Sequence, residues 1–494
     1  MDRKVCYIKP VQTGELDEFF IQVYTNPQGT NEIFLRTLHH WLPAMAPHLA
    51  AQKSSASVSD IELLSGLKRE LKAFSDSNKS SSSSSLVLVE TAGGVLSPGP
   101  SKTLQADIYR PLRLPVILVG DARLGGITST ISAYESLKSR GYTVYAIAIV
   151  ARPESDKYGN VPYLQEHFSK VYTGLDGDSS NAKWSIGVKP EVFSFTPLPE
   201  GLLHNWFQQN STEFKRLCEY ITERGVQEID QMHTMYIEGQ KKVWWPFTQH
   251  GIIGEKDTTF IESAHGEHFR TIKFKKRQAN DNTDNGNQID YEIIDMMDAC
   301  ASWWTQGVGH GNPYMSLALA QAAGRYGHVM FPSNLHPPAV QLTRYLLERG
   351  PGVGWADRVF FSDDGSTGME IAIKMALRLN KARNGPSKDD ENLVVLSQND
   401  CYHGDTLGTM DTSNPSVFNQ DQHPWYRPKG LSLEVPFVAY RKGILSIDTS
   451  RLTLSNIELF EKENTWKNID QIYDIDARLE SDSHISTQYR EYIR

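Results

Sequence analysis

The sequence predicts an α/β protein in which short parallel strands alternate with helices. Two observations carry this prediction. Through residues 1–205, short apolar runs alternate with longer stretches whose apolar residues recur at helical spacing. In the second half, Val359–Lys374 repeats the order of a strand, a tight turn and a helix. The chain has 494 residues, too many for one ordinary domain, so roughly two to four domains are expected.

Composition narrows the class of protein. With 39% hydrophobic and 22% charged residues, the composition is typical of a soluble globular protein. The net charge of −9 and the lack of a Lys/Arg stripe argue against a nucleic-acid partner. No apolar run reaches transmembrane length, so no membrane partner is expected. The four cysteines lack CxxC spacing, which indicates a reducing compartment and no zinc site.

The first half is expected to form a parallel sheet with helices on both faces, because helical stretches join its strands. Ser75–Ser85 is of low complexity and predicts a mobile loop or an insertion. Two further helices are expected to form either a connector to the second half or the first helices of that half. The expected strands are Lys4–Ile8, Leu86–Glu90, Pro115–Val119 and Tyr142–Ile149, and the expected helices are Ile61–Phe74, Gly125–Arg140, Leu202–Tyr220 and Thr222–Gly239.

The second half begins near Val243 and is richer in Trp, His and Gly. Its polar stretch Lys275–Gln288 predicts a loop or hairpin insertion. A charged helical tail is expected from Ile457 to the last residue, Arg494. The expected helices are Tyr314–Tyr326, Pro338–Arg349 and one with apolar positions Met369, Ile373 and Leu377; the expected strands are Val359–Phe361 and Val394–Leu396.

The turn between Phe361 and Met369 is a candidate phosphate seat. Gly365 allows a sharp turn, and Ser366 and Thr367 are residue types that cap helix N-termini. Such a turn points free backbone N–H groups and hydroxyls at one spot, which suits a phosphate. The alternative is an ordinary strand–turn–helix corner, which is common in α/β chains.

Three loops of small residues in the first half favour a nucleotide or phosphate site. Lys9–Gly14 follows the first expected strand, Glu90–Val95 the second, and Leu124–Thr130 opens a helix after the third. Ligands of open parallel sheets bind beyond the carboxyl ends of the strands. A lysine there meets a phosphate or carboxylate, and a glutamate suits Mg²⁺. The alternatives are a solvated surface lysine and a glutamate that faces water.

These three loops, KPVQTG, VETAGGV and PVILVGDARLGGIT, resemble the dethiobiotin synthetase family. The resemblance implies a P-loop NTPase-like parallel sheet and a reaction that carboxylates a diamine and closes it to a cyclic urea with ATP and Mg²⁺. It implies that Lys9 is catalytic and contacts the carbamate and phosphate, and that Thr13 binds substrate. It further implies that Glu90 and Asp17 bind the metal and that Leu124–Thr128 lines the substrate end.

Aromatic clusters mark the second half. Two tryptophans, Trp303 and Trp304, form either plain core or the wall of a site, and Phe247 lies in a similar aromatic turn. Tyr402 follows a strand, where a tyrosine stacks on a flat heteroaromatic ring. His403 beside it either positions such a ring or is a hydrogen-bonded turn histidine.

Together with SWWTQGVGHGNP, GHVMFPSNLHPPA, FFSDDGSTGMEIAIKMAL and CYHGDT, these residues resemble 7,8-diaminopelargonate aminotransferase, a class III, fold-type I enzyme that uses pyridoxal 5'-phosphate (PLP). The resemblance implies that Gly365 and Ser366 bind the cofactor phosphate and that Tyr402 stacks on its ring. Trp303, Trp304 and Phe247 then contact the substrate, although the family often has a tyrosine at the position of Phe247.

The order of the two halves resembles the fused bifunctional enzyme of biotin synthesis in fungi and plants. The expected domains are 1–205 (synthetase-like), 206–242 (helical connector) and 243–494 (an incomplete aminotransferase). The resemblance implies the small-molecule substrates 8-amino-7-oxononanoate, S-adenosylmethionine, 7,8-diaminononanoate, CO₂ and ATP. It also implies a homodimer and a mitochondrial location, although no presequence is visible and a cytosolic location stays open.

The family's Gly-rich phosphate loop precedes the KPVQTG motif, and its cofactor lysine and aspartate follow the YHGD motif. Neither is found in this sequence, so the chain is expected to be an inactive fragment. The alternative is a catalytically dead relative that binds a partner or metabolite. Both losses fall at chain ends while the internal motifs are intact, which favours a fragment.

Overall fold

A computed structural model describes residues 4–25, 33–78, 85–153, 157–173, 189–199, 203–246, 257–275, 289–386, 393–414, 429–435, 437–448 and 468–476, with short pieces at 248, 251–252, 254, 451, 465–466, 487 and 490. Its contacts divide into two compact units, Met1–Val329 and Met330–Arg494, and each is described by itself.

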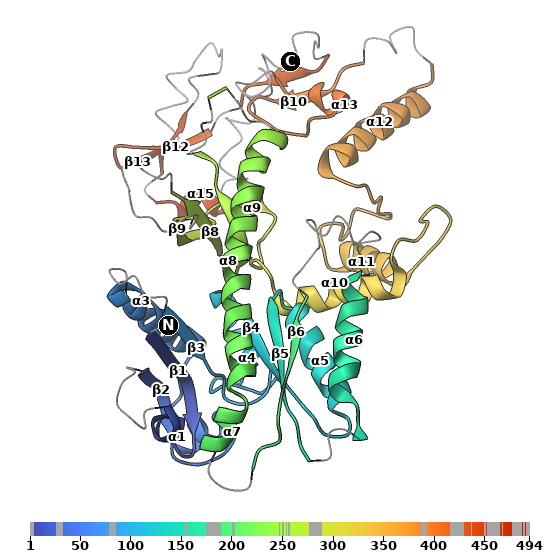
Figure 1. Ribbon diagram of the computed structural model, residues 1–494. Coiled ribbons are helices and arrows are strands. Elements are labelled where there is room, and N and C mark those ends of the chain that lie inside the picture. Colours follow the sequence, from blue (N-terminus) through green and yellow to red (C-terminus); the bar gives the residue numbers. More distant parts are fainter. Residues whose placement is uncertain are drawn as a thin grey trace. The chain divides into compact units, whose positions relative to one another are not determined.

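The first sheet of unit 1 has β1 (Lys4–Thr13) between β2 (Ile33–Trp41) and β3 (Ser85–Val89), all parallel (Figure 1). The expected strand at the start of the chain is confirmed, but it is longer than predicted. It pairs with β2 as far as Thr13, whereas its pairing with β3 stops at Ile8. Lys9 therefore lies inside the strand rather than after its end. It belongs to the part of β1 that pairs with β2 but not with β3.

The second sheet of unit 1 is parallel, with β5 (Val144–Val150) between β4 (Val116–Gly120) and β6 (Glu191–Phe195). Side chains alternate between the two faces of a strand. Ile147 and Ile149 accordingly join the core under α5 (Gly126–Lys138) and α6 (Asn160–Thr173), while Ala146 and Ala148 join the core under α7 (His204–Gln209) and α8 (Ser211–Lys242). The expectation of parallel strands covered by helices on both faces is confirmed. The strands described within residues 1–205 form two three-stranded sheets rather than one.

The helices of the first half follow the sequence pattern with two corrections. Helix α3 (Asp60–Asn78) buries Leu63, Leu67 and Phe74 against the first sheet. It continues through Asn78, so the expected Ser-rich loop begins inside a helix; residues 79–84 lie outside the described part. The expected helix Leu202–Tyr220 is divided at Asn210 into α7 and α8, and α8 then continues over 32 residues without the predicted break near Ile221. The shorter elements are α1 (Asp17–Thr25), α2 (Pro47–Lys53), α4 (Gln105–Ile108) and η1 (Arg110–Leu112).

The rest of unit 1 contains an antiparallel sheet that the sequence pattern did not predict, with β8 (His268–Phe274) between β7 (Phe260–His265) and β9 (Tyr291–Met297). The short α9 (Ala301–Trp304) and α10 (Pro313–Tyr326) follow. Helix α10 begins one residue before its expected range, Tyr314–Tyr326, and ends at the same residue. Residues 276–288 of the expected insertion lie outside the described part.

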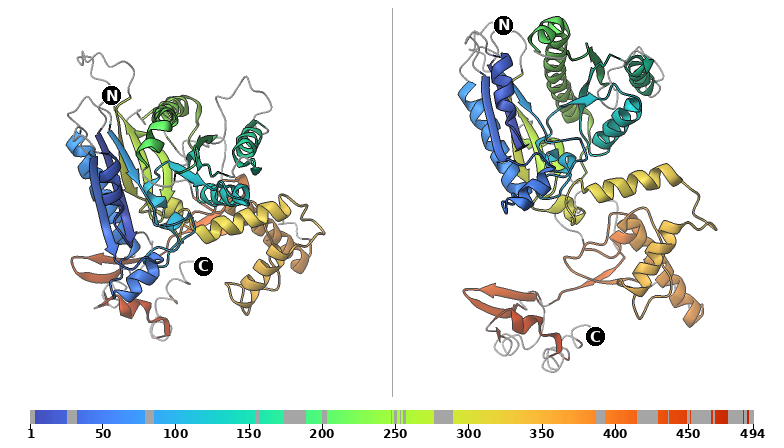
Figure 2. Two further views of the ribbon diagram at one scale, coloured as in Figure 1. Left: turned by 60° about the horizontal axis from the view of Figure 1, so that its bottom comes forward. Right: turned by 90° about the horizontal axis from the view of Figure 1, so that it is seen from below.

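Unit 2 begins with α11 (Pro337–Glu348), close to its expected range, and α12 (Gly365–Asn384), which contains the expected apolar positions Met369, Ile373 and Leu377 (Figure 2). The expected strand at Val359–Phe361 is wrong: these residues pair with no described strand, and Phe360 is 62% exposed. The expected strand Val394–Leu396 starts two residues later. The remaining elements are β10 (Leu396–Gln398), α13 (Leu407–Met410), β11 (Leu431–Leu433), β12 (Phe437–Arg441), β13 (Ile444–Asp448), β14 (Thr465–Trp466) and α15 (Asp470–Tyr473).

Most of the expected helical tail lies outside the described residues; its described part includes α15. Among the helices that the structure describes, none has the length and apolar character needed to cross a membrane.

Candidate functional site

Three of the residues predicted for the first site meet in one ion-pair cluster. The Lys9 ammonium lies 2.5 Å from Glu90 Oε1 and 2.8 Å from Asp17 Oδ2. Lys9 projects from β1, Glu90 follows β3 directly, and Asp17 is the first residue of α1. The Lys9 side chain is only 8% exposed, so the two carboxylates supply the counter-charge that a buried ammonium needs.

Tyr7 belongs to the same cluster and was not predicted. Its hydroxyl donates to Glu90 Oε2 at 2.7 Å and lies 3.5 Å from Asp17 Oδ2. Tyr7 and Lys9 are two residues apart on β1, so their side chains share one face of the strand. Burial and the hydrogen bond to Glu90 raise the pKa of Tyr7, which keeps its hydroxyl a donor. Burial alone would lower the pKa of Lys9, but hydrogen bonds to Asp17 and Glu90 outweigh it and raise this pKa.

The cluster opens into a cavity of about 440 Å³ at the end of β1. Thr13, the predicted substrate residue, lines this cavity together with Gln12. Gln12 donates through Nε2 to the Glu15 carbonyl at 2.6 Å, while its buried Oε1 has no hydrogen-bond partner in the described part of the chain. The other lining residues are Lys9, Val11, Asp17, Met45, Ala46, Pro47, Glu90, Ala92, Gly93, Ser97 and Pro98.

Glycine turns follow Thr13 and Ala92, two of the residues that line this cavity. Gly14 has a φ of +81° and donates its N–H to the Trp41 carbonyl, which turns the chain from β1 toward α1. Gly93 has a φ of +94°, and a Cβ there would lie 2.8 Å from Ser97 Oγ. The third predicted loop, Leu124–Thr128, is not among the residues that line the cavity. Its assignment to the substrate end stays a prediction.

The carboxylate pair fits a Mg²⁺ ion. Mg²⁺ prefers oxygen ligands and is commonly held by one or two carboxylates together with substrate phosphates. Glu90 and Asp17 both contact a single ammonium group, so they are close enough to share one cation. The described residues contain no group of three or more His, Cys, Asp or Glu side chains placed to hold a metal, so this site offers a pair of carboxylates.

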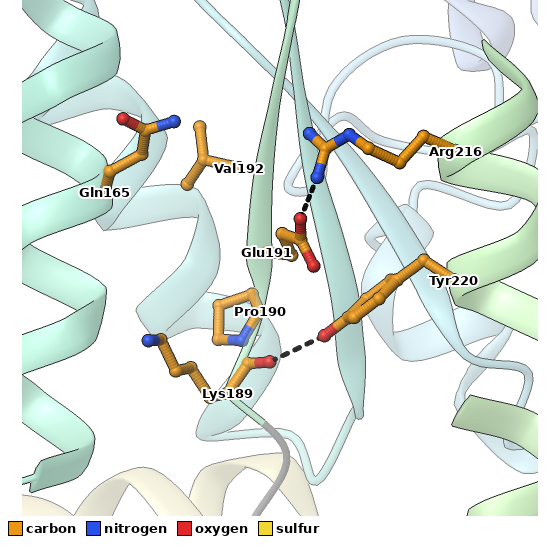
Figure 3. Close-up of a pocket in the computed structure, with 7 residues that line it drawn as sticks. All are labelled: Gln165, Lys189, Pro190, Glu191, Val192, Arg216 and Tyr220. Carbon is orange, nitrogen blue, oxygen red and sulfur yellow. Dashed lines mark hydrogen bonds and ion pairs between the residues drawn. The ribbon is translucent and has the colours of Figure 1, made fainter. Parts of the chain in front are cut away.

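A second cavity of about 290 Å³ lies at the start of β6, the opposite end of a strand from the usual ligand side (Figure 3). Its polar groups pair with one another. Arg216 of α8 forms an ion pair with Glu191 and lies 4.2 Å from the centre of the Phe193 ring. Tyr220 donates to the Lys189 carbonyl at 3.2 Å. These internal pairs account for the arrangement without a ligand.

The predicted cofactor residues of unit 2 also meet. The cap of α12 is Asp364, whose side chain accepts from the Thr367 N–H, and not Ser366 or Thr367 as predicted. The Ser366 hydroxyl instead accepts from the Asp405 N–H at 3.1 Å, which brings the Tyr402–Asp405 loop onto the start of the helix. Tyr402 donates to Asp405 Oδ2 at 2.5 Å, and this bond, with some burial, raises the pKa of Tyr402.

This corner fits a phosphate group. A Cβ added at Gly365 would meet no atom within 4 Å, so the first turn of α12 is open. The backbone N–H groups of Gly365 and Ser366 take part in none of the backbone hydrogen bonds described for this region. Free N–H groups at a helix N-terminus attract anions. The residues present therefore fit the phosphate of PLP, with Tyr402 next to it.

Trp303 and Trp304 lie in a strained turn of unit 1. All four residues of Ala301–Trp304 have positive φ, between 45° and 65°, a region that costs non-glycine residues roughly 1–2 kcal/mol each. Trp303 and Trp304 are 63% and 87% exposed. Their assignment to a substrate pocket stays a prediction. Phe247 lies outside the described residues.

Asp298, which was not predicted as a site residue, holds this turn. Its buried carboxylate lies 2.8 Å from His310 Nε2 and accepts from the Ser302 hydroxyl at 2.9 Å. Burial would raise the pKa of Asp298, but hydrogen bonds from His310, Ser302 and Cys300 outweigh it and hold the pKa well below its usual range.

Two family models match separate parts of the chain. A family model described as "AAA domain" matches residues 1–173, and one described as "Aminotransferase class-III" matches residues 278–465. The bifunctional dethiobiotin synthetase/adenosylmethionine-8-amino-7-oxononanoate aminotransferase of Emericella nidulans is 36% identical over 99% of this chain and 59% of its own length. The Arabidopsis thaliana bifunctional dethiobiotin synthetase/7,8-diamino-pelargonic acid aminotransferase, mitochondrial, is 38% identical over 90% of this chain and 50% of its own length.

A solved structure, the adenosylmethionine-8-amino-7-oxononanoate aminotransferase of Methanocaldococcus jannaschii, shares 23% identity over 41% of this chain and 40% of that chain, with a TM-score of 0.32. At that level the likeness adds nothing to the family models.

The fold is α/β, and the match to the AAA-domain family model precedes the match to the class III aminotransferase family model along the chain. The chain is a homologue, along nearly its whole length, of the bifunctional dethiobiotin synthetase/aminotransferase enzymes of biotin synthesis. It spans between half and three-fifths of the length of the E. nidulans and A. thaliana relatives.

Proposed function

We propose that the protein takes part in two consecutive steps of biotin synthesis. The first is PLP-dependent transamination of 8-amino-7-oxononanoate to 7,8-diaminononanoate, with S-adenosylmethionine as the amino donor. The second is the Mg²⁺- and ATP-dependent closure of this diamine with CO₂ to dethiobiotin. The observation that carries the proposal is the Lys9–Glu90–Asp17 cluster, which lines a cavity in the part of the chain that the AAA-domain model matches.

For ring closure, the chain supplies a cation and two carboxylates at one point. When bound, Mg²⁺ supplies charge neutralisation for phosphate oxygens. Glu90 and Asp17 would hold it, and the Lys9 ammonium, kept protonated by its raised pKa, would contact the carbamate and the transferred phosphate. Thr13 lines the same cavity and would orient the substrate.

For transamination, the chain supplies the seat of the cofactor. PLP supplies an electron sink for the amino-group transfer when bound. Gly365 and Ser366 would hold its phosphate at the start of α12, and Tyr402 would lie against its ring. Trp303 and Trp304 would contact the substrate. The Asp298 bonds keep the tryptophan turn in one conformation.

Binding of the diamine tests the first site. Isothermal titration of the chain with 7,8-diaminononanoate in the presence of Mg²⁺ and bicarbonate should give saturable binding. Replacing Lys9 by Gln should weaken it at least tenfold, because the ammonium that meets the carbamate is removed. The matched control is Lys189→Gln, a lysine that lines the unrelated cavity at β6. Equal losses in both variants, or no binding by the unaltered chain, would contradict the proposal.

Several finer points belong to the same proposal. Small-molecule substrates are supported by the enzyme relatives, and a homodimer is inferred from the resemblance to fold-type I enzymes. A mitochondrial location is supported by the names of the A. thaliana and rice relatives. The inactivity of this chain by itself stays a prediction. So does the division at residues 205 and 242.

A further inference from the structure

Lys9 occupies the position between Glu90 and Asp17 where a metal ion would be expected. We propose that Lys9 is the resident counter-ion of these carboxylates and that a divalent cation entering the cavity displaces it. The displaced ammonium then becomes free to meet an anionic group of the substrate. This inference rests on the proposed function, in which Glu90 and Asp17 hold Mg²⁺.

Exposure sets the direction of the exchange. The side chains of Glu90 and Asp17 are 54% and 40% exposed, whereas that of Lys9 is 8% exposed. A cation from solvent therefore reaches the carboxylates first. The cluster as it stands carries one positive and two negative charges. A divalent cation neutralises the two carboxylates completely and leaves the ammonium without a partner.

The buried ammonium group of Lys9 then needs a new counter-charge, because an unpaired buried charge is strongly unfavourable. The anion that the site recruits, a carbamate or a phosphate, supplies it. Cation and anionic substrate are thus expected to strengthen each other's binding, as reciprocal linkage requires. Lys9 acts as the coupling element, since it pairs with the protein in one state and with the substrate in the other.

Two neighbouring side chains support this exchange. Tyr7 bonds Glu90 Oε2, while Lys9 bonds Oε1, so the carboxylate keeps its orientation when the ammonium leaves. Gln12 is 6% exposed and lines the same cavity, and its Oε1 has no hydrogen-bond partner within the described residues. That oxygen is available to an incoming cation or to the displaced ammonium.

Binding of Mn²⁺, a spectroscopic substitute for Mg²⁺, tests the exchange in the full chain by electron paramagnetic resonance. Lys9→Met keeps the length of the side chain and removes its charge. It should bind Mn²⁺ roughly tenfold more tightly than the unaltered chain, about 1.4 kcal/mol, because no charge-assisted hydrogen bond is broken on entry. Lys189→Met, at the β6 cavity, should leave the affinity unchanged.

Glu90→Gln separates this inference from the proposed metal site. If Glu90→Gln weakens Mn²⁺ binding but Lys9→Met does not tighten it, the displacement is wrong and the metal site stands. If neither the unaltered chain nor Lys9→Met binds Mn²⁺, both are wrong.

A measurement on the unaltered chain covers the case in which Lys9→Met does not fold. Acetic anhydride labelling read by mass spectrometry should modify Lys9 at least threefold faster with saturating Mg²⁺, and Lys189 at an unchanged rate. Equal labelling of Lys9 with and without bound Mg²⁺ would overturn the displacement.

Discussion

Replacing Gly404 by Ala should separate the loop that carries Tyr402 from the start of α12. Gly404 has a φ of +128°, and a Cβ there would lie 2.5 Å from Ser366 Oγ and 2.7 Å from Ser366 Cα. The Ser366 backbone belongs to a helix, so the loop is the part that moves. The strained backbone costs roughly 1–3 kcal/mol and the overlap a similar amount. Allowing for partial relaxation, about 2 kcal/mol of local stability is lost.

Hydrogen exchange measured by mass spectrometry reads this loss directly. The Asp405 N–H bonds the Ser366 hydroxyl, so peptides that cover this amide should exchange roughly 30-fold faster in Gly404→Ala, the factor that corresponds to about 2 kcal/mol. Gly385→Ala is the matched control, because Gly385 has a φ of +75° at the other end of α12 but a Cβ added there would meet no atom within 4 Å. Unchanged exchange in Gly404→Ala, or an equal rise in both variants, would refute the reasoning.

Three further predictions follow from the two sites. The raised pKa of Lys9 means that its ion pairs contribute stability that is complete below the unfolded-state pKa of about 10.4 and is lost only as pH rises through the higher folded-state pKa. The midpoint of thermal unfolding should therefore fall less above about pH 10 in Lys9→Met than in the unaltered chain, and parallel curves would contradict this. Tyr7→Phe removes one hydroxyl that donates to a half-exposed carboxylate and should weaken Mn²⁺ binding about threefold to tenfold, whereas Tyr163→Phe, on the exposed side of α6, should not. The lowered pKa of Asp298 means that its bonds contribute stability above the unfolded-state pKa of about 3.9 that is lost as pH falls through the lower folded-state pKa. Hydrogen exchange of the backbone amides of residues 301–305 should accordingly rise in the unaltered chain only below about pH 4. In Asp298→Asn it should be raised already at about pH 7. Equal exchange in the two proteins at neutral pH would show that Asp298 does not hold the turn.

The sequence pattern predicted β1, β3, β4 and β5 but missed the buried strand β6 and the less buried strands β2 and β9. Val144–Val150 is a continuous apolar run because both faces of β5 are covered. β2 was missed because Arg36, His39 and His40 interrupt its apolar residues, although β1 pairs with it along its whole length. β9 was missed because its residues are exposed. The strand predicted at Val359–Phe361 fails for the opposite reason: an apolar run is not a strand without a partner in the described structure.

The sequence predicted the site residues that belong to recognisable local motifs, but not those whose role depends on contacts distant in the sequence. Lys9, Asp17 and Glu90 were each recognised from a motif or a resemblance, and the structure brings all three together. Tyr7 was not recognised, because its hydrogen bond to Glu90 joins residues 83 positions apart and no local motif around Tyr7 indicates that bond. Asp298 was missed because its role depends on the left-handed turn at Ala301–Trp304, which apolar spacing does not reveal.

The central claim is that Lys9 holds the carbamate of a diamine during ring closure. Carbon-13 NMR of the chain with ¹³C-labelled bicarbonate, 7,8-diaminononanoate and Mg²⁺ tests it most directly. A protein-bound carbamate resonance is expected for the unaltered chain and for Lys189→Gln, and its loss is expected for a folded Lys9→Gln variant. No bound carbamate in the unaltered chain, or the same resonance in Lys9→Gln, would contradict the claim.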